Sequence, residues 1–221
     1  MIGQVYRSRT MLVTLSASYG AGGSKVGPEL AAELGVPFVD RAIPVAVAER
    51  LAVPLDEVIA RDETQGSRLD RLLRDFAPAV QVYAGGGAMI PTAFEEHGYR
   101  EATEQVIKEA AARGEGVILG RAASVVLLDD PRVLRVRLDG PAEARLAQAM
   151  ATDGIDHKTA KRRMKETDGA RDAYMQHFYR RDSHDPTLYH LMLDATAFSI
   201  AACVELIAMA ARAHDAAIAS E

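Results

Sequence analysis

Residues 11–35 read MLVTLSASYGAGGSKVGPELAAELG. The apolar run from Met11 to Leu15 predicts a buried strand, and the helical spacing of the later apolar residues predicts a helix: Val26, Leu30, Ala31 and Leu34. A glycine-rich turn, Gly20 to Ser24, separates the two. A strand that ends in glycines at a helix N-terminus presents backbone N–H groups and the positive end of the helix dipole to a phosphate. The stretch therefore predicts a nucleotide-binding loop and favours phosphoryl transfer.

The turn departs from the usual P-loop pattern of Gly, four residues, Gly-Lys and Ser or Thr. Ala17 stands at the first glycine position and Gly23 at the lysine position, so the nearest cation is Lys25. The glycines also lack the rhythm of a dinucleotide-binding fingerprint. A glycine-rich turn without a ligand stays an alternative. Otherwise the donor nucleotide is expected on these residues: Gly20, Ala21, Gly22, Gly23, Ser24 and Lys25.

Composition narrows the class of protein. The chain has 221 residues, 48% of them hydrophobic, which suits one α/β domain with an insert or lid. Its net charge of −5 argues against a general nucleic-acid binder. The single cysteine, Cys203, excludes a disulfide framework. No apolar run has the length of a membrane span and the first residues lack an apolar signal core, so we expect no membrane partner and a cytoplasmic location.

Further strands and helices alternate along the chain. Strands are expected at 36–39, 116–119, 133–138 and 190–193, and helices at 41–51, 99–113, 141–150, 157–181 and 199–213. This order predicts a doubly wound α/β fold with a parallel sheet, whose ligands bind at the carboxyl ends of the strands. We expect a single domain with its core at 10–53, 114–156 and 188–214. An insert would occupy about 54–113 and a lid about 157–187.

Two charged residues follow predicted strands. Asp40 follows the second strand, where a carboxylate can orient a hydrated Mg²⁺ or accept a proton, although it could equally cap the next helix. Arg121 follows the third strand, where a guanidinium can hold a phosphate through two hydrogen bonds, although a plain surface position is the alternative. Together with the glycine loop, these residues predict a phosphoryl-transfer site at the carboxyl edge of the sheet.

Residues 157–181 are strongly basic, with eight Lys or Arg against three Asp or Glu in a protein that is acidic overall. We expect a basic helical hairpin that closes over polyphosphate as a lid, since such a lid excludes water and stabilises moving charge. A solvated charged helix is the alternative. Asp168 and Arg171 are three residues apart and share one helix face, so they could act together.

Three stretches resemble the cytidylate kinase-like family, a branch of the P-loop nucleoside monophosphate kinases. They are VTLSASYGAGGSKVGPELAAELGVPFVDR, GVILGRAASVVLLDDPRVLRVRLDGPAEAR and ETDGARDAYMQHFYRRDSHDPTLYHLMLDAT, in that order. Glycine at the lysine position is itself similar to this branch. The resemblance implies a P-loop kinase-type three-layer fold with a helical lid and a helical acceptor-binding insert. It also implies ATP as phosphoryl donor, Mg²⁺, and small-molecule nucleotide substrates.

The resemblance also implies roles for individual residues. Loop amides would hold the donor phosphates, with Lys25 reaching in and Ser24 joining Asp40 at Mg²⁺, directly or through water. Asp40 with its neighbour Arg41, and Arg121 of a Gly-Arg-Asp-like motif, would bind the acceptor phosphate. In the lid Asp-x-x-Arg, Asp168 would contact the acceptor sugar and Arg171 the phosphates, with Arg163 as a further lid arginine. The catalytic set implied in this way is Asp40, Arg121, Arg171 and Lys25.

Other positions depart from the family pattern. Ala122 replaces the aspartate of Gly-Arg-Asp, Ser16-Ala17-Ser18 replaces Ser-Arg-Glu, and no cytosine-reading site is recognisable within 54–97. The expected function is transfer of the ATP γ-phosphoryl group to a nucleoside monophosphate, with CMP or dCMP as the best single acceptor. Phosphorylation of a metabolite hydroxyl and nucleotide binding without catalysis are the alternatives. The apolar last helix is expected to pack in the core and leaves a homodimer contact open.

Overall fold

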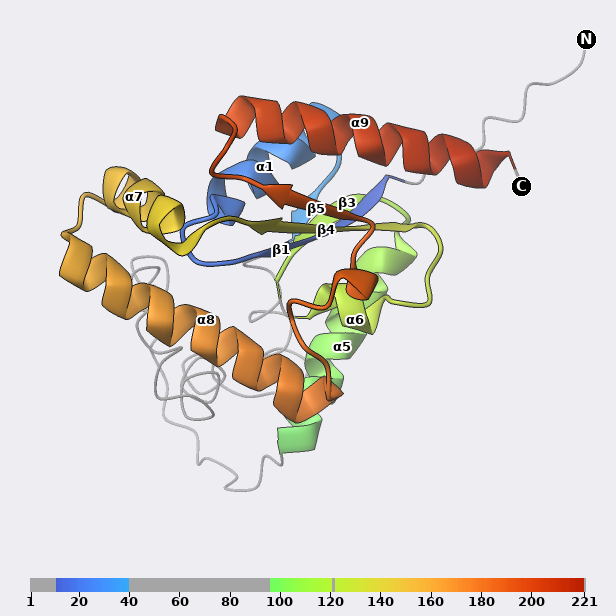
Figure 1. Ribbon diagram of the computed structural model, residues 1–221. Helices are drawn as coiled ribbons and strands as arrows, with labels where there is room; N and C mark the ends of the chain where they lie inside the picture. Colours follow the sequence, from blue (N-terminus) through green and yellow to red (C-terminus); the bar gives the residue numbers. More distant parts are fainter. Residues whose placement is uncertain (1–10, 40–95, 121, 221) are drawn as a thin grey trace, which may run out of the picture.

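The computed structural model describes residues 11–39, 96–120 and 122–220 (Figure 1). Its strands are β1 (Leu12–Ala17), β2 (Phe38–Val39), β3 (Gly116–Leu119), β4 (Val133–Asp139) and β5 (Leu191–Asp194). Its helices are α1 (Gly23–Leu34), α5 (Glu96–Ala112), α6 (Ala123–Val126), α7 (Ala142–Asp153), α8 (His157–Tyr179), a 3-10 turn η2 (Pro186–Leu188) and α9 (Ile200–Ala219).

The five strands form one parallel sheet in the order β2-β3-β1-β4-β5. β1 is central because it pairs with both β3 and β4. The chain first builds the half with β2 and β3 on one side of β1 and then the half with β4 and β5 on the other, which makes the carboxyl end of β1 the switch point where ligands bind in such folds. The glycine-rich turn follows β1 directly. The predicted doubly wound α/β fold is confirmed.

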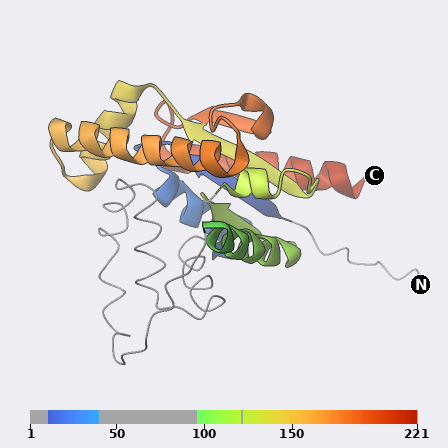
Figure 2. The same cartoon turned by 90° about the horizontal axis from the view of Figure 1, so that it is seen from below.

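Helices cover both faces of the sheet. α1 and α9 bury one face around residues such as Val26, Leu30 and Ile207, while α5 and α6 bury the other around Ile107 and Ala123. Figures 1 and 2 show α8 on the same side as α5 and α6, with α9 on the opposite side. The sheet is therefore the middle of three layers. Helix α7 follows the carboxyl end of β4, and α8 follows α7.

Some element boundaries differ from the sequence expectation. The basic stretch is one continuous helix, α8, so the hairpin expected within 157–181 is wrong. Asp156 caps this helix by accepting a hydrogen bond from Thr159 N, and nothing breaks the helix before Arg180, whose φ of 54° is left-handed. The antiparallel partner of α8 is α7, which packs on it through Leu146, Ala149, Ala160 and Met164.

The last helix contributes to the core as expected. In α9, Cys203 and Ile207 are fully buried against the sheet, but Met209 is 62% exposed. Burial also raises the pKa of the Cys203 thiol. None of the helices within the described ranges is long and apolar enough to cross a membrane.

Candidate active site

The glycine-rich turn forms a backbone loop between β1 and α1. Gly20 and Gly22 both have a φ of 78°, a left-handed conformation that glycine adopts without strain. Gly22 is the N-cap of α1, and the Ala21 amide donates to the Ser18 carbonyl to close the turn. Gly23 and Ser24 open the helix, so their N–H groups have no intrahelical partner. The loop and the helix dipole together suit an anionic group.

The two departures from the P-loop pattern are in contact with each other. A Cβ atom added at Gly23 would lie 2.5 Å from the Ala17 Cβ, which is closer than real Cβ atoms come. The methyl group at the first position therefore fills the space from which a lysine at residue 23 would extend. Because Gly23 does not have a positive φ, this restriction arises from packing and not from the backbone.

Helix α8 contacts the loop through Asp168. Its Oδ1 accepts a hydrogen bond from Tyr19 N at 2.8 Å, and its Oδ2 accepts one from Arg145 Nη1 at 2.7 Å. Arg145, on α7, also donates to the Tyr19 carbonyl from Nη1 at 2.8 Å and to the Gly140 carbonyl from Nε at 2.9 Å. Both backbone polar groups of Tyr19 are thus held by α7 and α8.

The other lid candidates also lie near the loop. Arg171 Nη1 donates to the Ala17 carbonyl at 2.6 Å, and its guanidinium is 3.8 Å from Asp168. Arg163 lies 3.8 Å from Asp153, the carboxylate that accepts a weaker hydrogen bond from Tyr19 Oη at 3.4 Å. The structure therefore brings Arg171, Asp168 and Arg163 to residues 17–19, the start of the loop.

Lys25 extends from α1 towards α7, where its Nζ lies 3.5 Å from Thr152 Oγ1. Ser24, the residue before it, is exposed at the helix start. Its hydroxyl suits Mg²⁺, an ion that prefers oxygen ligands and retains several waters. Within residues 11–39, 96–120 and 122–220, no group of three or more His, Cys, Asp or Glu is arranged to hold a metal ion. Among the described residues, the Ser24 hydroxyl is the group predicted to bind Mg²⁺ there, and the predicted partner Asp40 lies outside them.

Beneath the loop, β4 carries a polar pair. Arg137 is almost fully buried and donates from Nη2 to Ser18 Oγ and to Asp139 Oδ2, both at 3.0 Å. Burial alone would raise the pKa of the Asp139 carboxyl. Hydrogen bonds from Ser18, Arg137 and the Gly140 amide outweigh this effect and hold the pKa below its usual value. The carboxylate is thus kept charged directly under residue 18.

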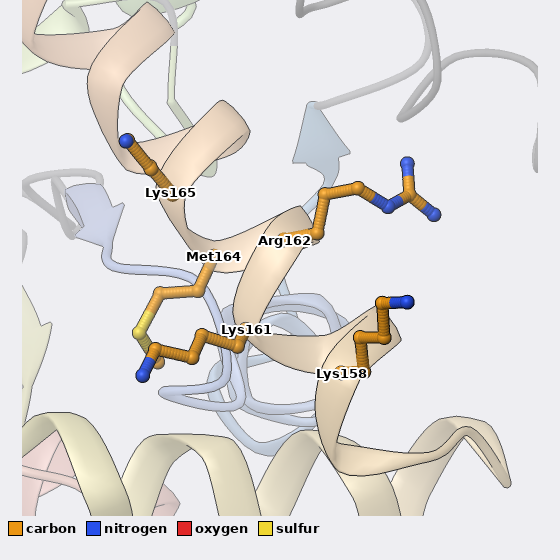
Figure 3. A pocket seen from close by; sticks show the side chains of 5 residues that line it. All are labelled: Lys158, Lys161, Arg162, Met164 and Lys165. Atoms are coloured by element: carbon orange, nitrogen blue, oxygen red, sulfur yellow. The ribbon is translucent and has the colours of Figure 1, made fainter.

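An open hollow of about 490 Å³ lies on α8 (Figure 3). Met164 and four basic side chains line it: Lys158, Lys161, Arg162 and Lys165. The spacing of the four cations, at i, i+3, i+4 and i+7, places them along one side of the helix. No glycine-loop residue lines this hollow, so these four cations form a basic stripe that belongs to α8 alone.

Three predicted site residues, Asp40, Arg41 and Arg121, lie outside the described residues, as do the helix expected at 41–51 and most of the expected insert. Their proposed roles stay predictions.

Sequence reasoning missed Tyr19, Arg137, Asp139 and Arg145. A signal existed for Arg137, because an arginine near the carboxyl end of a buried strand needs a partner inside the protein. Arg145 carries no comparable signal. An arginine on the surface of a helix looks ordinary until the fold places the loop beside it.

Known proteins share this fold and sequence pattern. A solved structure of an uncharacterized protein from Eubacterium ventriosum aligns with a TM-score of 0.61 and 18% identity, covering 91% of this chain and 98% of that one. At that identity the similarity concerns the fold alone. A curated cytidylate kinase from Methanopyrus kandleri is 32% identical over 100 residues, which are 42% of this chain and 52% of the relative. The matched region thus spans about half the length of that relative.

A broader match comes from the sequence model of one family. It extends from residue 12, at the start of β1, to residue 197, just before α9. It therefore includes the glycine loop, the paired helices α7 and α8, and the five strands described above. Since this match covers most of the chain, the protein belongs to the cytidylate kinase-like family.

Proposed function

We propose that the protein is a phosphotransferase that moves the γ-phosphoryl group of ATP, with Mg²⁺, to a small acceptor. A nucleoside monophosphate is the proposed acceptor class, and CMP or dCMP is the first to test. Membership of the cytidylate kinase-like family and the partial similarity to a curated cytidylate kinase support this choice. No described residue is assigned to reading the acceptor base, so base specificity rests on these similarities alone.

The observation that carries the proposal is the loop between β1 and α1 with α8 held against it. The loop presents first-turn amides of α1, and α8 brings the Arg171 guanidinium to the start of the same loop. A phosphoryl group in transfer spreads negative charge over its oxygens, and fixed N–H donors and guanidinium groups stabilise that charge most strongly. Positioning and charge neutralisation are therefore the chemistry that this site can supply.

Each described residue then has one proposed role. The amides of Gly20, Gly22, Gly23 and Ser24 hold the donor phosphates, the Ala21 amide closes the turn onto Ser18, and Lys25 adds positive charge at the edge of the phosphates. Ser24 Oγ holds Mg²⁺, which supplies neutralisation of phosphate charge when bound. Arg171 stabilises the transferring group, while Arg163 and the basic stripe of α8 attract anionic substrates. Asp40, Arg41 and Arg121 keep their predicted roles at the acceptor phosphate.

A second candidate is nucleotide binding without catalysis, favoured by one observation. The contact between Ala17 and Gly23 leaves no room for a P-loop lysine, the side chain that usually reaches the β- and γ-phosphates. This candidate predicts ATP binding with no ADP formed for any acceptor. A kinase of a metabolite hydroxyl predicts ADP formation with a hydroxyl acceptor and none with nucleoside monophosphates.

The test is calorimetric titration of ATP–Mg²⁺ into the purified protein, followed by a panel of acceptors with ADP detection. We expect ATP binding and ADP formation with CMP or dCMP. Arg171→Ala should lower kcat by about 100-fold, since one transition-state donor is typically worth that much. The matched control is Arg212→Ala, which removes an exposed pair with Glu33 on the α1–α9 side and should retain activity. Unchanged turnover in Arg171→Ala would contradict the site assignment.

A further inference from the structure

We infer that Arg145 is a positioning residue of the donor-nucleotide site, which joins the glycine loop and the lid helix into one unit through Asp168. The inference rests on the proposed function for its meaning, but its physical content concerns contacts within the chain. Arg145 is not among the residues predicted to contact a substrate. It acts through Tyr19 and Asp168.

The geometry around Tyr19 carries the inference. Tyr19 donates its N–H to Asp168 on α8, and its carbonyl accepts from Arg145 on α7. Arg145 and Asp168 are bonded to each other at 2.7 Å, with side chains only 12% and 22% exposed. Three hydrogen bonds therefore form a closed set that joins the Tyr19 backbone, Arg145 on α7 and Asp168 on α8. A pair shielded from water in this way is screened weakly by salt.

This set belongs to a longer chain of alternating charges. Its order is Arg137, Asp139, Arg145, Asp168 and Arg171, with nitrogen–oxygen separations of 3.0, 3.5, 2.7 and 3.8 Å along it. The chain begins on the buried strand β4 and ends on α8, and Arg145 is its middle member. Its members also form hydrogen bonds with Ala17, the last residue of β1, and with Ser18 and Tyr19, which follow it.

The position of α8 and the conformation of the glycine loop are therefore coupled in one conformational equilibrium. If α8 moves away, Tyr19 N loses its acceptor and Arg145 loses the nearer of its two carboxylates, which leaves a partly buried cation with only Asp139 at 3.5 Å. That cost favours the arrangement in which the loop is shaped for phosphate. Removing Arg145 should therefore weaken nucleotide binding without removing any nucleotide contact.

The experiment is a double-mutant cycle with Arg145→Ala, Asp168→Ala and both together, measured as the Kd for ATP–Mg²⁺ and as amide hydrogen exchange. Each single variant should raise the Kd about tenfold, and the double variant should be no weaker than the weaker single one. Peptides covering 16–24 and 157–179 should lose protection together in all three. Arg145→Lys keeps the charge but not the fork of donors, so it should restore only part of the affinity.

Two controls separate positioning from general stability. Arg132→Ala breaks a 2.6 Å pair with Asp130 just before β4, far from the loop in the sheet, and should change neither readout. Ile207→Val trims the α9 core and should lower the urea midpoint, yet leave the Kd and the coupled exchange unchanged. A rise in Kd for Ile207→Val equal to that for Arg145→Ala would overturn the inference.

Additive effects in the double variant, or loss of protection in the loop without loss in α8, would also overturn it. If the protein does not bind ATP, the proposed function fails, but the exchange measurement still decides whether Arg145 joins α8 to the loop. The two failures are therefore distinguishable.

Discussion

The methyl group of Ala17 and the absent side chain of Gly23 share one small space at the start of α1. The 2.5 Å separation computed for a Cβ at residue 23 makes the two residues energetically dependent on each other. Gly27 is restricted in a similar way, since a Cβ there would lie 2.7 Å from the Phe38 ring. Glycines in this loop and helix are thus required by close packing as well as by turn geometry.

We predict that Gly23→Lys alone destabilises the fold by about 1–3 kcal/mol, the usual cost of overpacking a filled site. In the Ala17→Gly background the same lysine should cost much less, because the opposing methyl group is gone. Urea unfolding of both single variants and the double variant measures the difference. Equal costs of the lysine in the two backgrounds would show that the two residues do not interact.

At the scale of elements, local signals fix most helix ends. Ser199 accepts a hydrogen bond from Ala202 N at 3.2 Å and caps α9. We predict that Ser199→Ala lowers the unfolding free energy by about 1 kcal/mol, the typical value of an N-cap. Ser199→Asp retains an oxygen acceptor and should stay close to the parent protein. Thermal unfolding of both variants checks this, and an equal loss in Ser199→Asp would contradict a capping role.

The elements that could be predicted are those with a strong local pattern. The apolar runs of β1, β3 and β4 and the helical spacing of α1 placed these elements to within a few residues, and α9 begins where expected but continues beyond 213 to Ala219. Helix α8 was expected at 157–181, but the hairpin expected within it was wrong, because its polar sequence gives no hydrophobic stripe long enough to distinguish one helix from two. The four-residue helix α6 was missed because one turn has no periodicity to detect.

The candidate site was predictable only in part for the same reason. Glycines after a strand and charged residues three apart on a helix are visible in the sequence, so the loop, Asp168 and Arg171 could be named as candidates. Their partners are not visible, since Arg145 lies 126 residues from Tyr19 and meets it only through the fold. A prediction from sequence names the chemical groups present, and the structure decides which groups they contact.

At the scale of the whole molecule, the end of the sheet remote from the loop carries a buried charge. Arg135 on β4 is 9% exposed and donates to the carbonyls of Leu188 and Leu128. His190 and His214 stack beside it with ring centroids 5.2 Å apart. Burial lowers the pKa of both imidazoles, and the Arg135 cation lowers it further. The Asp215 carboxylate acts in the opposite direction and raises the pKa of His214. In the same way, the Asp129 carboxylate raises the pKa of Arg135.

We predict that stability falls as the pH drops from about 7 towards 5. The unfolded chain binds protons at its ordinary histidine pKa of about 6.5, while the folded protein resists them until a lower pH. The contribution is therefore complete above the unfolded pKa and is lost as the pH falls through the folded one. Urea midpoints between pH 5 and 8 measure it, and His190→Asn with His214→Gln should flatten the slope. An unaltered slope in that double variant would assign the pH dependence to other groups.

The contact between residues 17 and 23 also fixes an order of events in descent. A lineage with this loop can acquire a lysine at position 23 without crossing an unstable intermediate only if alanine at 17 has already become glycine. The reverse order passes through a protein in which two side chains occupy the same space. Ancestral reconstructions of such loops should therefore contain sequences with glycine at both positions more often than sequences that pair alanine with lysine, which carry the cost of overpacking.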